Sequence, residues 1–145
     1  MSIKLSIKNN FKNKDIKNYV LFCNENFNIT DLKKYLSNSE FSFISDLLKN
    51  SDLKKDLLFF EINSKKSIYL VSIKKNLKTS EIESLGAKFH NYINYDKKND
   101  YYVNIDTIKS KIDNFSGYFL HGLKLKSYEF NIYKSKKNTK LISIN

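Results

Sequence analysis

The sequence predicts an α/β fold in which a mixed β-sheet is flanked by helices on both faces, built as one domain from residues 1–145. Three observations lead to this prediction. Strand-like apolar segments alternate with helix-like segments, which is typical of layered α/β proteins. Tyr19–Cys23 is apolar at every position, as in strands that are covered on both faces of a sheet. Leu57–Ile62 and Ile68–Ile73 are separated by a connection of hairpin length, so the sheet includes an antiparallel pair.

The first third of the chain predicts two strands and a short helix. Met1–Lys8 alternates apolar and polar residues, which indicates a strand with one buried face. A polar stretch separates it from the apolar strand Tyr19–Cys23. Thr30 or Asp31 can then cap a short helix that ends near Ser37.

Two further helices are marked by their expected starting residues. One is expected to begin at Ser39, which we take as its N-cap. Another is predicted to run from Ser80 to Ile93, because Ser80 and Glu83 have the spacing of a capping box. Its apolar residues recur at steps of three and four, and they include Ile82, Leu85, Gly86, Phe89 and Ile93. Tyr101–Ile105 then forms a strand.

The stretch Phe115–Lys137 contains the last predicted helix. Its apolar residues have helical spacing, and they are Phe115, Tyr118, Phe119, Gly122, Leu123 and Leu125. Gly122 lies inside this pattern, where a glycine costs ~1 kcal/mol relative to alanine. We therefore expect a close neighbouring backbone at Gly122. The helix is expected to end near Lys124–Ser127, where lysines suit the negative end of its dipole.

After Ser127, aromatic and apolar residues alternate with polar residues, which predicts an extended or irregular passage. Tyr128, Phe130 and Tyr133 are expected to hold this end of the chain against the sheet. We interpret them as structural residues that bind no ligand. Leu141–Ile144 is the last predicted strand.

The same segment resembles the end of the N-terminal domain of the leucyl aminopeptidase family. There, a helix runs into a serine–tyrosine pair, an aromatic residue and a tyrosine–lysine pair. The residues that carry the resemblance here are Gly122, Leu123, Ser127, Tyr128, Phe130, Tyr133 and Lys134. The resemblance extends over most of the chain from about Tyr19 onward. It implies a macro-domain-like fold.

The resemblance also implies a function for the complete protein, that of a cytoplasmic leucyl aminopeptidase that releases N-terminal amino acids from peptides. In this family two divalent metals, manganese or zinc, are bound by a C-terminal catalytic domain that is not part of this sequence. We therefore expect no catalytic residue, no metal ligand and no cofactor in this chain. The implied partners are the missing catalytic domain and a homo-oligomer, a hexamer in this family, and the implied role is in assembly or regulation.

Candidate sites within the chain give little support for catalysis. His90 and His121 are far apart in the sequence, and neither has a second ligand at metal-binding spacing. Cys23 ends an apolar strand, which indicates a buried and inert thiol, with a cysteine–histidine pair left open as an alternative. Similarity to macro domains suggests ADP-ribose as a ligand, but by analogy of fold alone. With three glycines, the chain lacks the glycine-rich loops that let a backbone approach a diphosphate.

The net charge of +11 raises nucleic acid as a second class of partner. All 26 basic residues are lysines, spread along the chain, so general surface charge is the simpler interpretation. The densest basic cluster is interleaved with tyrosines and would contact DNA weakly, without sequence preference. It comprises Lys124, Lys126, Lys134, Lys136, Lys137 and Lys140. The alternative function is therefore a stand-alone basic module that binds nucleic acid. No membrane partner is expected, because no apolar run approaches the ~20 residues of a membrane span.

Overall fold

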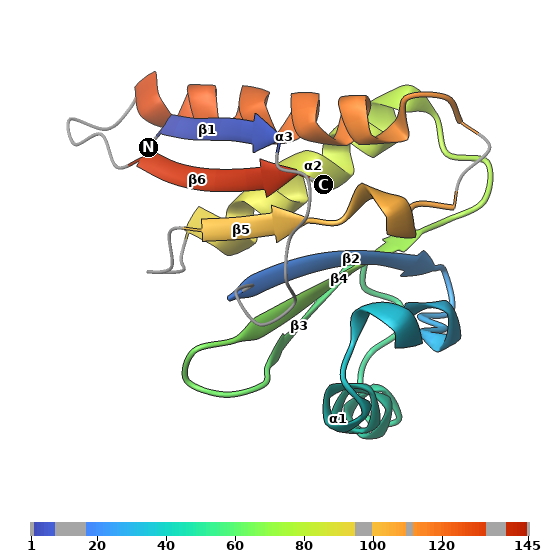
Figure 1. The fold of residues 1–145 in the computed structure, drawn as a ribbon. Coiled ribbons are helices and arrows are strands. Elements are labelled where there is room, and N and C mark those ends of the chain that lie inside the picture. The colour runs from blue at the N-terminus through green and yellow to red at the C-terminus, as the bar shows by residue number, and fades with distance from the viewer. Residues whose placement is uncertain (1, 8–16, 95–99, 110–111, 133–138, 145) are drawn as a thin grey trace.

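The structure is a computed structural model that describes residues 2–7, 17–94, 100–109, 112–132 and 139–144. Within these residues, six strands form one sheet in the order β1-β6-β5-β2-β4-β3 (Figure 1). The strands are β1 (Ser2–Ile7), β2 (Asn18–Asn24), β3 (Leu57–Glu61), β4 (Ser67–Ile73), β5 (Asp100–Val103) and β6 (Thr139–Ile144). Neighbouring strands are parallel except β3 and β4, which are antiparallel. The predicted mixed sheet and its hairpin are therefore confirmed.

The helices α2 (Thr79–Asn94) and α3 (Phe115–Ile132) cover one face of the sheet (Figure 1). Their apolar stripes meet the strands in a core that includes Phe22, Phe89 and Phe119, all of them buried. The ring of Phe119 meets that of Phe22 edge to face, with the centroids 5.2 Å apart. No helix in the described ranges is long and apolar enough to cross a membrane.

The backbones of α2 and α3 approach each other at two glycines. A Cβ atom added to Gly122 would lie 1.9 Å from the carbonyl oxygen of Glu83 in α2. One added to Gly86 would lie 1.9 Å from the carbonyl oxygen of Phe119 in α3. Any side chain at either position would therefore force the helices apart. The predicted close neighbour of Gly122 is confirmed, and it is the backbone of α2.

The opposite face of the sheet is covered by the 3₁₀ helix η2 (Thr30–Tyr35) and by α1 (Asn38–Leu48). Alternate residues of β2 serve the two cores, because successive side chains of a strand point to opposite faces. Val20 packs on the side of α2 and α3, whereas Leu21 packs with Ile44 of α1. The prediction of helices on both faces is confirmed.

The structure corrects the predicted starts of the two segments on this face. The 3₁₀ helix η2 has no side-chain cap, so neither Thr30 nor Asp31 caps it. Helix α1 is capped by Ser37 and not by Ser39. The Ser37 hydroxyl accepts a hydrogen bond from the Glu40 backbone N–H at 3.2 Å, and Glu40 Oε1 accepts one from the Ser37 N–H at 2.9 Å. This reciprocal pair decides the start, because Glu40 stands three residues after Ser37.

Helix α2 also begins earlier than predicted. It starts at Thr79, so Ser80 lies inside the helix and its hydroxyl is not the N-cap. The carboxylate of Glu83, the other member of the predicted capping box, lies with its Oε1 3.3 Å from Nδ1 of His121 in α3. The side chain of Glu83 therefore contacts α3 instead of capping α2.

The prediction of an extended or irregular passage after Ser127 is wrong. Helix α3 continues to Ile132. Tyr128 and Phe130 therefore belong to a helix. Neither glycine nor proline follows Gly122, so the sequence supplies none of the usual signals that end a helix. The side chains of Tyr128 and Phe130, and the whole of Tyr133, lie outside the described part of the chain, so their structural role stays a prediction.

Candidate functional site

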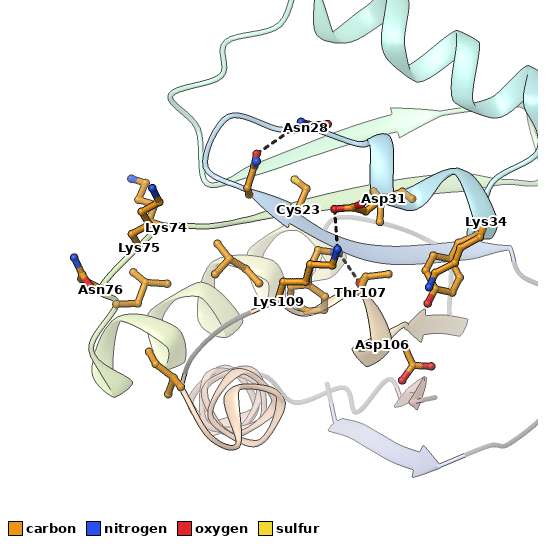
Figure 2. A pocket seen from close by; sticks show the side chains of 17 residues that line it. Cys23, Asn28, Asp31, Lys34, Lys74, Lys75, Asn76, Asp106, Thr107 and Lys109 are labelled. Atoms are coloured by element: carbon orange, nitrogen blue, oxygen red, sulfur yellow. Dashed lines mark hydrogen bonds and ion pairs between the residues drawn. The ribbon is translucent and has the colours of Figure 1, made fainter.

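A cavity of about 750 Å³ lies where β2, β4 and β5 end. Strand β2 pairs in parallel with both β4 and β5, so the carboxyl ends of the three strands meet at one edge of the sheet. Open α/β sheets commonly bind ligands at this edge. Four segments supply the walls, namely the end of β2, the helix η2, the chain after β4 and the chain after β5 (Figure 2).

The loop between β2 and η2 is shaped by asparagines. Oδ1 of Asn24 accepts hydrogen bonds from the backbone N–H groups of Asn26 and Asn28, both at 3.0 Å. Oδ1 of Asn28 accepts one from the N–H of Thr30, also at 3.0 Å. Side chains of this type commonly replace the backbone as acceptors in turns. The loop is thus held by its own side chains, and it leads directly into η2 at the cavity wall.

The segment after β5 is anchored to β2 by a backbone hydrogen bond, from the Asn104 N–H to the carbonyl oxygen of Val20 at 3.0 Å, and by side chains. Thr107 lies in the 3₁₀ helix η3 (Ile105–Thr107), and its Oγ1 accepts a hydrogen bond from the Phe22 N–H at 2.9 Å. The same hydroxyl donates to the carbonyl oxygen of Asn104 at 2.7 Å. Nδ2 of Asn104 donates to the hydroxyl of Tyr19 at 2.7 Å. These buried contacts fix η3, and with it the residues that follow into the cavity wall.

Cys23 lines the cavity from the end of β2, but its thiol is 8% exposed. Its Sγ lies 3.7 Å from the carbonyl oxygen of Val71, at the outer limit for a sulfur hydrogen bond. Burial raises the pKa of the Cys23 thiol to about 12. The thiolate is the reactive form of cysteine, and a raised pKa leaves little of it at neutral pH. The predicted burial of Cys23 is confirmed.

The cavity wall carries more positive than negative charge. Four lysines and two aspartates line it, and they are Lys34, Lys74, Lys75, Lys109, Asp31 and Asp106. Nζ of Lys74 lies 3.2 Å from Oδ1 of Asp56, and Nζ of Lys34 lies 5.1 Å from the ring centroid of Tyr35. The interior is apolar, with Phe22 and Leu77 among the lining residues. Such a cavity suits a ligand with an apolar part and an anionic group.

One ion pair joins two of the four walls. Nζ of Lys109, after η3, lies 2.8 Å from Oδ2 of Asp31 in η2 (Figure 2). The hydrogen bond from Lys109 and its charge lower the pKa of the Asp31 carboxyl below its usual value, and the charge of Lys34 adds to this. Asp31 is therefore an anion at neutral pH, held beside a lysine that lines the cavity.

No protein-family model and no curated protein matches this sequence. Solved structures do match it. The structure is similar to a macrodomain, that of Thermus aquaticus DarG, with 6% identity, a TM-score of 0.63 and coverage of 99% of both chains. The fold is macrodomain-like. The structure is also similar to a mutant leucine aminopeptidase from tomato, with 14% identity, a TM-score of 0.62 and coverage of 99% of this chain. This chain spans 32% of the length of that aminopeptidase.

These two matches confirm, at the level of fold, the predicted resemblance to leucyl aminopeptidases and macro domains. They also confirm the predicted fold class. With identities of 14% and 6%, they establish no function.

The histidines do not form a site with the cysteine. Cys23 packs in the core on the side of α1, whereas His90 and His121 belong to α2 and α3 on the opposite face. The alternative of a cysteine–histidine pair is therefore wrong. Among the described residues, no group of three or more histidine, cysteine, aspartate or glutamate side chains could hold a metal ion.

The predicted DNA-contacting lysines lie away from this cavity wherever the structure describes them. Lys124 is exposed and Lys126 is half-buried, both on α3, and neither lines the cavity. Lys134, Lys136 and Lys137 lie outside the described residues, and the side chain of Lys140 is not described.

The lysines that do line the cavity were missed by sequence reasoning. A usable signal existed, because Lys74 and Lys75 directly follow the apolar strand that ends at Ile73. Asn24 follows Cys23 in the same way. Polar residues just after buried parallel strands are brought to one edge of a sheet. This signal points to a shared site only if β2 and β4 are parallel neighbours, and local sequence does not show that pairing.

Proposed function

We propose that this chain is a non-catalytic binding domain whose cavity takes a small anionic ligand. The observation that carries the proposal is the cavity of about 750 Å³ at the carboxyl ends of the parallel strands β2, β4 and β5. Its wall has four lysines and two aspartates. A volume of this size fits a nucleotide-sized molecule.

The ligand would be recognised by side chains more than by backbone amides. All three glycines, Gly86, Gly117 and Gly122, lie in α2 or α3, and none lines the cavity. The wall therefore lacks the glycines that usually let a loop wrap a diphosphate closely. Lysines can bind phosphate or carboxylate as point charges without that approach. ADP-ribose is thus one candidate among several anions, suggested by the macrodomain-like fold.

We propose further that the domain serves the assembly or regulation of a larger enzyme of the leucyl aminopeptidase type. The support is the match of 99% of this chain to 32% of the tomato aminopeptidase. The complete enzyme would then be a cytoplasmic hexamer that releases N-terminal amino acids from peptides, with two manganese or zinc ions in its catalytic domain. An anion in the cavity of the non-catalytic domain would be a regulatory ligand of such an enzyme.

Isothermal titration calorimetry with ADP-ribose, ADP and pyrophosphate tests the binding proposal, with adenosine as the uncharged comparison. We expect at least one anion to bind and adenosine to bind more weakly. Lys75→Gln should weaken binding about three- to tenfold, because it removes one charge-assisted contact. Lys49→Gln is the matched control, since Lys49 is the C-cap residue of α1, pairs with Asp46 and does not line the cavity. The proposal fails if no anion binds up to about 1 mM, or if the two variants lose affinity equally.

A further inference from the structure

Asp31 and Lys109 meet across the cavity from two different walls. Asp31 belongs to η2, which follows β2, and Lys109 comes after η3, which follows β5. Figure 2 shows the pair in the middle of the lining residues. The labelled residues after β4 lie on one side of it, and Lys34 and Asp106 lie on the other. Both residues line the cavity, so a ligand bound there could contact the pair.

Each of the two segments is held in place by contacts other than this ion pair. The loop before η2 is fixed by the side chains of Asn24 and Asn28, and η3 is fixed to β2 through the hydroxyl of Thr107. The side chains of Asp31 and Lys109 are both 70% exposed. Exposed ion pairs contribute little to stability, so this pair can open without disturbing the fold.

We infer that Asp31 is a built-in competitor for anionic ligands at Lys109, whose ammonium group it occupies until a ligand displaces it. The inference rests on the proposed function, because it names the residues that set the affinity of the same cavity. A carboxylate and a phosphate oxygen both accept charge-assisted hydrogen bonds from a lysine. A phosphate-bearing ligand can therefore replace Asp31 at Lys109 one for one.

The test compares affinities for pyrophosphate and ADP by calorimetry. Asp31→Asn should tighten binding about two- to fivefold, since an exposed ion pair biases an equilibrium by no more than about that factor. Lys109→Gln should weaken binding. The double variant Asp31→Asn/Lys109→Gln should bind pyrophosphate and ADP no more tightly than Lys109→Gln alone, because Asp31 competes only for Lys109.

A matched control separates local competition from a change in net charge. Asp46 is an exposed aspartate that pairs with Lys49 on α1, with Oδ1 and Nζ 3.6 Å apart, and it does not line the cavity. Asp46→Asn changes the net charge by the same amount as Asp31→Asn, but it should leave affinity unchanged because Asp46 does not line the cavity.

The outcomes distinguish this inference from the proposed function. If the wild type binds an anion, but Asp31→Asn behaves like Asp46→Asn, the competitor role is wrong and the binding proposal stands. A gain from Asp31→Asn that persists in the Lys109→Gln background also overturns it, since the effect would then not pass through Lys109. If neither wild type nor Asp31→Asn binds any anion, both proposals fail together.

Discussion

Substituting Gly122 by alanine tests the close contact between α2 and α3. The new Cβ atom would lie 1.9 Å from the carbonyl oxygen of Glu83, and its next neighbours there are also backbone atoms. Backbone atoms cannot rotate away as a side chain can. The helices would therefore have to separate by about 1 Å or more to restore ordinary contact distances.

Two opposing effects set the magnitude of this change. Alanine favours a helix over glycine by ~1 kcal/mol. Overpacking a well-packed core costs ~1–3 kcal/mol, and a clash with backbone belongs at the upper end of that range. We expect a net loss of about 2 kcal/mol in the free energy of unfolding. For a domain of this size, that lowers the melting temperature by about 4–8 °C.

Thermal melts followed by circular dichroism provide the assay, with Gly86→Ala as a second variant. A Cβ atom on Gly86 would lie 1.9 Å from the carbonyl oxygen of Phe119, so the same loss is expected. Gly117→Ala is the control within α3. The atoms nearest to its added Cβ belong to the side chain of Asn114, the first of them at 2.4 Å, and a side chain can move where a backbone cannot. If Gly122→Ala melted at or above the wild-type temperature, the two backbones could not be as close as the structure has them.

Three other predictions can be checked on the same protein. Burial raises the pKa of Glu40, but hydrogen bonds from Lys66 and Ser37 outweigh it, and the net pKa is lowered. Glu40→Gln should therefore lower the free energy of unfolding at pH 7 by ~1–3 kcal/mol, measured in denaturant melts. The difference from the wild type should disappear as the pH falls from the ordinary pKa of 4.5 through the lowered pKa of Glu40, because the carboxylate is then protonated. DNA should bind weakly and without sequence preference, and a sequence-specific complex that survives ~200 mM salt would contradict this. Phe130→Ala should cost ~3–5 kcal/mol of stability while Glu129→Ala costs little, and equal melting temperatures would show that the ring is not buried.

Much of the fold could be read from local pattern. The apolar run Tyr19–Cys23 and the strand pair around Asn63–Lys66 identify β2, β3 and β4, because fully covered strands and hairpins have local signatures. Gly122 indicated a close backbone because its cost in a helix needs a packing reason. The cap at Ser37 also has a local signature, since Glu40 follows it at capping-box spacing, and the prediction of Ser39 did not use it. The end of α3 was not readable, because no glycine or proline marks it.

The cavity could not be predicted from the sequence, because it depends on pairings between distant segments. Lys74 and Lys109 stand far apart in the chain and line the same cavity only because β4 and β5 flank β2 in the sheet. Asp31 reaches Lys109 through a loop whose shape depends on the asparagine side chains after β2. Tertiary structure determines the order of the strands and the shape of this loop, and the local periodicity of the sequence indicates neither.

The most direct test of the account is an NMR titration of this chain with ADP, following the backbone amides. If the cavity is the binding site, chemical-shift changes will be concentrated at Asn24, Lys75, Thr107 and Lys109, with little change in α1. These changes should also weaken as salt is raised, because lysines bind the anion. Changes confined to α3 around Lys124 and Lys126, or no change at saturating ADP, would contradict the claim that the cavity at the carboxyl ends of β2, β4 and β5 is the binding site.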